Sequence, residues 1–203
     1  MGDILTKMAD MFNGEEASYC FVGCGLPGRG MGWYHALQLL NGEIPRARLS
    51  DVVEPFFLGA GKDLPPGKAF AKMAEDWKKK GVQFHASVDS GSLFSQATSS
   101  TKIALIAGRT CDNPGFFRQA IKAGATHILL EKPGAPTVGE LESMAALAKE
   151  KGVPVFMGFI KNISDYVEGA LAAAAKAPAG ADVETLLVSR NDYTKDNLGE
   201  CFS

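Results

Sequence analysis

Residues 19–35 read YCFVGCGLPGRGMGWYH. The order of residue types predicts a buried strand, a glycine-rich turn and the start of a helix. Gly23, Gly25 and Gly28 satisfy the pattern G-x-G-x-x-G. In this pattern the first glycine permits a sharp turn, the second lets the backbone approach a phosphate, and the helix points its free N–H groups at the anion. The segment therefore predicts a site for the pyrophosphate of a dinucleotide.

The glycine pattern needs a structural context, because the chain contains 23 glycines and the spacing can arise by chance. Helical patterns occupy most of the gaps between apolar segments, with Asn113 as an expected helix N-cap and Thr137 and Glu140 as a capping box. A short helix is expected near Leu93. The expected strands are residues 17–22, 48–54, 82–86, 102–107, 127–130 and 153–158.

Alternation of this kind requires crossover connections between parallel strands. It predicts an α/β fold with a doubly wound sheet of six strands in the order 3-2-1-4-5-6. We expect residues 1–160 to form this dinucleotide-binding domain. Residues 161–203 are expected to begin a second, incomplete α+β domain, with a helix within 163–176 and a strand at 183–189.

Composition excludes several classes of partner. The chain has 203 residues, 46% of them hydrophobic, and a net charge of −2 from 21 basic and 23 acidic side chains. Without a basic stripe or an apolar run of roughly 20 residues, neither nucleic acid nor a membrane is an expected partner. The four cysteines lack C-x-x-C spacing, which favours reduced thiols in a cytoplasmic compartment.

Ligands of doubly wound sheets bind beyond the carboxyl ends of the strands. This rule selects the glycines of the turn as cofactor contacts, and Glu54 after the second strand as an acceptor for ribose hydroxyls. A carboxylate there repels a 2′-phosphate and so favours NAD over NADP, although Lys62 in the next loop leaves NADP as an alternative. The turn glycines in question are Gly23, Gly25, Gly28, Gly30 and Gly32.

The same rule selects two further groups. Gly108, Thr110 and Asn113 follow the fourth strand, where small and hydroxyl residues would let a nicotinamide ribose lie flat; an ordinary βα loop is the alternative. Glu131 and Lys132 follow the fifth strand. A lysine in a cleft can transfer protons near neutral pH, whereas a solvated surface charge is the commoner role of such a lysine.

Other reactive residue types favour packing roles. His35, early in the first helix, is expected in the core or behind the site, and Cys24 is expected to fill space within the turn. His85 and His127 have no Cys or carboxylate at ligand spacing, so no metal site is expected.

Three segments together resemble the Gfo/Idh/MocA family of glucose–fructose oxidoreductases and inositol dehydrogenases: VGCG at 22–25, AGATHILLEKP at 123–133 and VPVFMGF at 153–159. The resemblance spans about residues 17–160. It implies a Rossmann domain and an NAD-dependent oxidoreductase, with NADP as the alternative cofactor, acting on a sugar, polyol or similar hydroxyl substrate. It also implies that Lys132 lies near nicotinamide and substrate and assists proton transfer, and it allows a cis bond before Pro133.

The chain departs from the family pattern in three places. The glycine turn is longer than usual, so that Gly28 and Gly32 compete for the third glycine position. Ile160 and Lys161 stand where the family often has Asn and Arg. The family's second domain, which covers the cleft, is expected to be present only at its beginning.

These departures keep other functions open. One is a non-catalytic module that binds a dinucleotide or a partner protein, and a less favoured one is an S-adenosylmethionine-dependent methyltransferase. An incomplete cleft exposes apolar surface, so this surface is expected to associate either with another copy of the chain, as a homo-oligomer, or with a missing segment.

Overall fold

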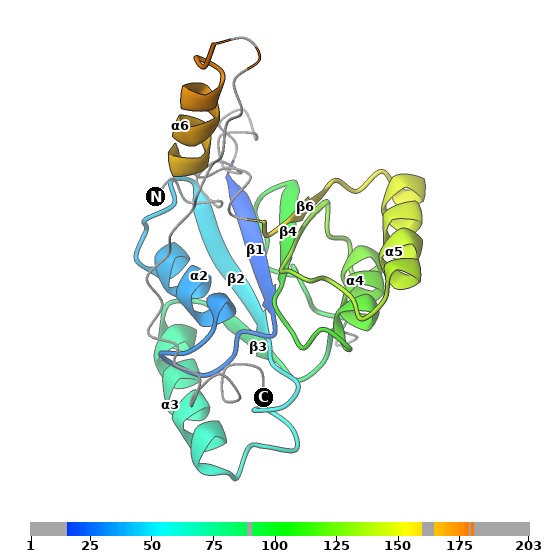
Figure 1. Ribbon diagram of the computed structural model, residues 1–203. Coiled ribbons are helices and arrows are strands. Elements are labelled where there is room, and N and C mark those ends of the chain that lie inside the picture. Colours follow the sequence, from blue (N-terminus) through cyan, green and yellow to red (C-terminus); the bar gives the residue numbers. More distant parts are fainter. Residues whose placement is uncertain (1–15, 89–90, 160–164, 179, 181–203) are drawn as a thin grey trace, which may run out of the picture. The chain divides into compact units, whose positions relative to one another are not determined.

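The computed structural model describes residues 16–88, 91–159, 165–178 and 180 (Figure 1). The chain divides into two compact units, residues 1–163 and 164–203. The second unit contains helix α6 (Asp165–Ala174), which lies within the helical segment predicted there. The predicted strand at 183–189 lies outside the described residues, so the assignment of a second domain stays a prediction.

The first unit is built on a sheet of six parallel strands in the order β3-β2-β1-β4-β5-β6. This order is the predicted one. The chain crosses over from β3 to β4, which pairs with β1, so the end of β1 lies at the point where the strand order reverses. Doubly wound sheets bind ligands at this point. The strands are β1 (Ala17–Val22), β2 (Ala47–Val53), β3 (Gln83–His85), β4 (Thr101–Ile106), β5 (His127–Leu130) and β6 (Val155–Met157).

Helices cover both faces of the sheet (Figure 1). One face is covered by α2 (Met31–Leu40) and α3 (Pro65–Lys79), and the other by α4 (Asn113–Lys122) and α5 (Val138–Lys151). The strands are therefore apolar on both sides. In β1, Tyr19 and Phe21 join the core beneath α2 and α3, while Cys20 and Val22 join the core beneath α4 and α5.

Local sequence signals account for most helix ends. The hydroxyl of Thr137 accepts a hydrogen bond from the Glu140 N–H at 3.3 Å and donates to the Glu140 carboxylate at 2.8 Å, which confirms Thr137 as the N-cap of α5. Gly152 ends α5 with a left-handed backbone, φ 65°.

Two local predictions are wrong. Asn113 is the first residue of α4 rather than its N-cap; the N-cap is Asp112, whose side chain makes no capping hydrogen bond. The Asn113 side chain is instead buried. Residues around Leu93 form a turn rather than a helix, because Phe94 has φ 59° and its N–H donates to the Asp51 carboxylate at 3.3 Å.

A buried polar pair links two neighbouring strands. His85 Nε2 lies 2.8 Å from the carboxylate of Asp51, and both side chains are almost fully buried. Together with the bond from the Phe94 N–H, this pair ties the connection after β3 to β2. A charge in the middle of a sheet is tolerated when it is paired in this way.

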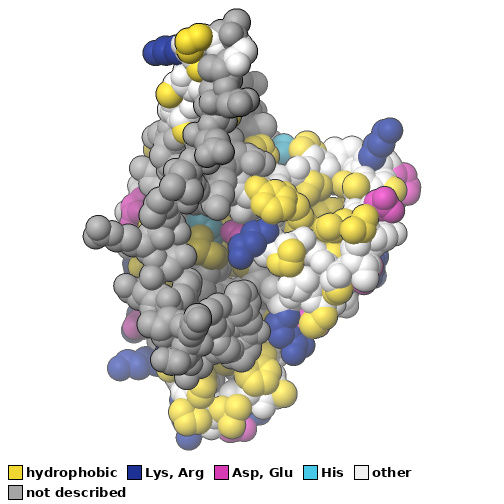
Figure 2. All heavy atoms as spheres, in the orientation of Figure 1, with side chains coloured by type: hydrophobic (Ala, Val, Ile, Leu, Met, Phe, Trp, Pro, Cys, Tyr) yellow, Lys and Arg dark blue, Asp and Glu magenta, His cyan; other side chains and the backbone are white. Residues whose placement is uncertain are grey.

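The surface around β6 carries apolar side chains. Hydrophobic groups gather on the visible face near β6, α4 and α5 (Figure 2). Val155 and Phe159 are 39% and 48% exposed, respectively. Among the described residues, no helix combines the length and the apolar character needed to span a bilayer.

Candidate functional site

The turn after β1 requires glycine because it touches the end of β4. Gly23 has φ 79°, and a Cβ on it would lie 2.6 Å from the Cα of Gly108. Its own N–H donates to the carbonyl of Val53 at 2.9 Å, which ties the turn to the end of β2 as well. Three strand ends therefore meet at Gly23, at the point where the strand order reverses.

The third glycine of the turn is Gly32. A Cβ on Gly32 would lie 2.7 Å from the carbonyl oxygen of Gly23 and 3.0 Å from that of Cys24, so this glycine allows α2 to pack directly on the turn. Gly28 has no atom within 4 Å of a Cβ position. It lies in the longer loop, and Gly30 forms the N-cap of α2.

Among the described residues, no side chain caps the N-terminus of α2. Its N-cap, Gly30, has no side chain to cap the helix, and the first turn contains no acidic residue. The first N–H groups of the helix therefore keep their hydrogen-bonding capacity and their partial positive charge. This arrangement fits a pyrophosphate.

Glu54 directly follows β2 and its carboxylate reaches the glycine turn. The N–H of Gly25 donates to Oε2 at 3.0 Å, and the side chain is only 5% exposed. Burial raises the pKa of this carboxyl above its usual value, while hydrogen bonds from the N–H groups of Gly25, Phe56 and Phe57 act in the opposite direction. Two carboxylate oxygens offer about four acceptor positions, so capacity remains for a hydroxyl of a ligand.

A pocket of about 550 Å³ opens at these strand ends. Gly23, Gly25, Glu54 and Gly108 line it, and an aromatic wall completes it. The sequence patterns did not predict this wall. Two of its members nevertheless stand just after Glu54, at the carboxyl end of β2, where ligands of doubly wound sheets bind. The wall consists of Phe56, Phe57 and Phe116.

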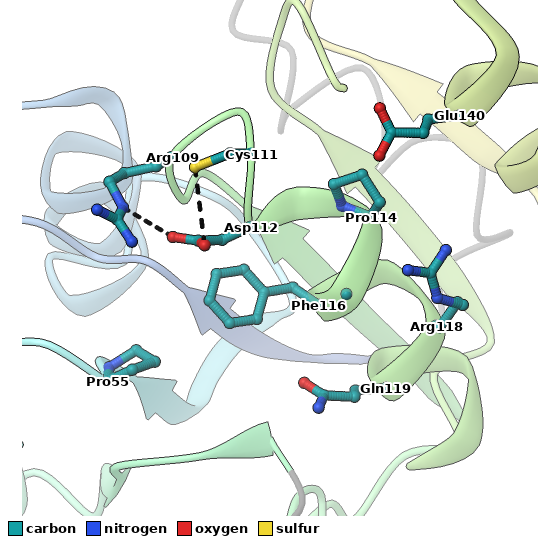
Figure 3. Close-up of a pocket in the computed structure, with 10 residues that line it drawn as sticks. Pro55, Arg109, Cys111, Asp112, Pro114, Phe116, Arg118, Gln119 and Glu140 are labelled. Atoms are coloured by element: carbon teal, nitrogen blue, oxygen red, sulfur yellow. Dashed lines mark hydrogen bonds and ion pairs between the residues drawn. The ribbon is translucent and has the colours of Figure 1, made fainter. Parts of the chain in front are cut away.

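A second pocket of about 500 Å³ adjoins the first and shares part of its lining (Figure 3). Arg109 lies between the two, and the Asp112 carboxylate holds its guanidinium at 2.7 Å. Exposed Cys111 lies beside the same carboxylate, with 3.7 Å between Sγ and Oδ1. The far side carries Arg118 and Glu140, so this pocket is lined by charges of both signs.

The residues predicted after β4 separate into two groups. Gly108 lines the 550 Å³ pocket, but neither Thr110 nor Asn113 does. Asn113 is 2% exposed and its Oδ1 has no hydrogen-bond partner among the described residues. That oxygen lies 3.1 Å from where a Cβ of Gly108 would stand, so Asn113 packs against this glycine.

Glu131 and Lys132, the site residues predicted after β5, lie at the carboxyl end of that strand. They line neither of the two pockets. The Glu131 side chain is 14% exposed, and its Oε1 lies 3.6 Å from Nε2 of His35. Lys132 is exposed, and the bond between Lys132 and Pro133 is cis.

Cys24 and His35 are both buried. Burial raises the pKa of the Cys24 thiol strongly, with a smaller contribution from the Glu54 carboxylate, so the thiol stays protonated and fills space within the turn. His35 lies behind Glu131 rather than in the pocket. Within the described residues, no group of three or more His, Cys, Asp or Glu side chains has the arrangement of a metal site.

The sheet order, the glycine turn and the acid after β2 define the class as a dinucleotide-binding Rossmann domain. Residues 67–159 match the model of the Gfo/Idh/MocA family, described as an oxidoreductase family with an NAD-binding Rossmann fold. This segment of the chain is therefore similar to that family. This match confirms the predicted resemblance to the Gfo/Idh/MocA family, and the description of that family agrees with the predicted NAD cofactor.

Solved structures show the same fold. Apo scyllo-inositol dehydrogenase from Lactobacillus casei aligns with a TM-score of 0.57 and 18% identity over 79% of this chain and 42% of its own. A WlbA dehydrogenase from Chromobacterium violaceum, in complex with NADH and UDP-GlcNAcA, has a TM-score of 0.57 and 18% identity over 78% of this chain and 39% of its own.

A third structure, UDP-N-acetylglucosamine 3-dehydrogenase GnnA from Acidithiobacillus ferrooxidans, has a TM-score of 0.56 and 19% identity over 78% of this chain and 42% of its own. The present chain thus spans less than half the length of these neighbours. No curated protein matches the sequence.

Proposed function

We infer that this chain binds NAD at the carboxyl ends of β1, β2 and β4 and serves an oxidoreductase whose substrate is a sugar, a polyol or a related hydroxyl compound. The observation that supports it most directly is the meeting of Gly23, Glu54 and Gly108 in one pocket. The nicotinamide cofactor, when bound, supplies the hydride acceptor or donor. The side chains and the backbone of the protein bind and orient the two ligands and move the proton.

The turn and the start of α2 would hold the pyrophosphate. Gly32 brings the helix against the turn, and the uncapped first N–H groups provide donors for the phosphate oxygens. The first two residues of the helix, Met31 and Gly32, are uncharged and do not repel an anion. Gly25, whose N–H is held by Glu54, keeps the backbone close to that position.

The adenosine end would lie against Glu54 and the aromatic wall. Glu54 accepts ribose hydroxyls and repels a phosphate at the 2′ position, which favours NAD over NADP. Phe56, Phe57 and Phe116 supply an apolar surface for a base. Lys62 is exposed in the next loop and is the residue through which NADP would be accommodated.

Lys132 would move the proton of the substrate hydroxyl. It is exposed at the end of β5 and makes no ion pair or hydrogen bond with the other described residues, so its ammonium is free to contact a substrate. The named substrates of the neighbouring structures, inositol and UDP-sugars, support a hydroxyl-rich substrate for this chain.

Lys132→Met tests this role. It should reduce turnover with a polyol or UDP-sugar panel by about two to four orders of magnitude, the usual contribution of general acid–base catalysis, and leave NADH affinity within about twofold. Lys122→Met, at the exposed end of α4, is the matched control. Equal losses of turnover and of NADH binding would contradict a role in proton transfer.

A second function remains a candidate: a module that holds the dinucleotide without performing chemistry. The observation that favours it is that neither pocket is lined by Glu131 or Lys132. NADH binding without turnover over the whole panel would establish it. The methyltransferase alternative is disfavoured, because the family whose model matches residues 67–159 is an NAD-binding one.

A further inference from the structure

A buried polar chain runs from α2 to the end of β5. Nδ1 of His35 lies 3.2 Å from the side-chain carbonyl of Gln38, and Nε2 of His35 lies 3.6 Å from Oε1 of Glu131. His35 is 3% exposed, and Nε2 has no hydrogen-bond partner within bonding distance among the described residues. A buried imidazole nitrogen without a partner is costly. The carboxylate of Glu131 is therefore the group that accounts for a histidine at this buried position.

The orientation of the Gln38 amide decides which nitrogen of a neutral His35 carries the ring hydrogen. With the Gln38 carbonyl facing Nδ1, the hydrogen lies on Nδ1 and donates to it. With the amide turned round, Nδ1 accepts from Gln38 and the ring hydrogen lies on Nε2. In this second arrangement His35 presents an N–H toward the carboxylate of Glu131.

Gly158 bounds the same carboxylate from the other side. A Cβ on Gly158 would lie 2.9 Å from Oε2 and 3.1 Å from Oε1 of Glu131. The backbone of Glu131 is fixed as well, because its N–H donates to the carbonyl of Ile106 at 2.9 Å. The absence of a side chain at position 158 leaves the space that the carboxylate occupies.

We propose that His35 and Gly158 are positioning residues that set the carboxylate of Glu131, His35 through the N–H that Nε2 presents toward Oε1 and Gly158 by leaving room beside β6. The proposal rests on the proposed NAD-binding function and on the expectation, from its place directly after β5, that Glu131 contacts the cofactor. It concerns two residues that need not touch the cofactor themselves. Their effect on binding passes entirely through Glu131.

The first test removes and restores the donor. His35→Leu fills the same space without an N–H and should raise the Kd for NADH, measured by fluorescence titration, about tenfold. His35→Gln keeps a side-chain N–H and should stay within about threefold of wild type. Equal losses in both variants would show that only packing around His35 matters.

The second test moves the carboxylate without removing any polar group. Gly158→Ala should displace the flexible end of Glu131 and raise the Kd about fivefold, while the fold is retained because a side-chain end yields easily. Gly139→Ala is the matched control, since a Cβ on Gly139 in α5 meets no atom within 4 Å. Its Kd should not change.

A double-mutant cycle separates positioning from any independent role. In a Glu131→Ala background, His35→Leu and Gly158→Ala should change the Kd for NADH by less than about twofold. Full additivity with Glu131→Ala would overturn the proposal. Failure of the wild-type chain to bind NADH would instead contradict the proposed function, and thermal unfolding of each variant shows which losses come from misfolding.

Discussion

At the scale of single residues, Glu54 does two things that are separable by experiment. Its carboxylate accepts a hydrogen bond from the Gly25 N–H, and in the proposed function its charge repels a phosphate on the ribose. The strand-end rule found Glu54 from the sequence alone. The rule did not find that the carboxylate is buried and already bonded, because that depends on how the turn folds back.

Glu54→Gln should weaken the preference for NADH over NADPH. The amide oxygen still accepts from Gly25, but the charge that repels a 2′-phosphate is gone. We expect the ratio of the two dissociation constants to fall about tenfold, equivalent to about 1.4 kcal/mol. Fluorescence titration at pH 8 measures both constants, and Glu142→Gln on α5 is the control. An unchanged ratio would remove Glu54 from cofactor selection.

The raised pKa of Glu54 also predicts a pH dependence of stability. In the folded protein this carboxyl binds its proton more tightly than in the unfolded chain, whose pKa is near 4.5. Its contribution to stability is therefore fully present below pH 4.5 and declines as pH rises through the higher folded pKa. Urea unfolding should show the stability of Glu54→Gln, relative to wild type, increasing with pH from about 4.5 upward. A difference that stays constant would contradict the burial effect.

At the scale of elements, the sequence was informative wherever a local pattern decides the outcome. Apolar runs separated by helical patterns predicted the strand order, and Thr137 predicted the start of α5. The prediction of Asn113 as an N-cap was wrong because the helix α4 begins one residue earlier than the residue type indicates. Asn113 is its first residue and Asp112 is its N-cap. The choice between Gly28 and Gly32 depends on packing of α2 against the turn, which spacing alone does not encode.

The Asp51–His85 pair shows the other limit of sequence reasoning, since it joins residues 34 positions apart. Asp51→Leu leaves His85 and the Phe94 N–H without this partner inside the protein. We expect the free energy of unfolding to fall by about 3–5 kcal/mol. Urea unfolding of this variant beside His85→Phe and the double variant measures the coupling. A double variant as unstable as the sum of the single ones would show that the pair does not act as a unit.

At the scale of the whole molecule, the β6 edge of the sheet is the surface suited to association. Val155 and Phe159 expose apolar area at β6, which is an edge strand of the sheet formed by the described residues, and edge strands invite pairing with another chain. We expect sedimentation equilibrium to give a mass above the 21.5 kDa of one chain, with Phe159→Ser lowering it. A monomer at all concentrations would contradict this expectation.

Binding of NADH to the 203-residue chain is the measurement that tests the central claim most directly. The structure offers a pocket lined by the glycine turn and a buried acid, with the uncapped α2 packed on the same turn. A fluorescence titration should therefore show saturable binding of NADH, with NADPH bound about tenfold more weakly because of Glu54. Saturation by neither nucleotide, or tighter binding of NADPH, would contradict the account.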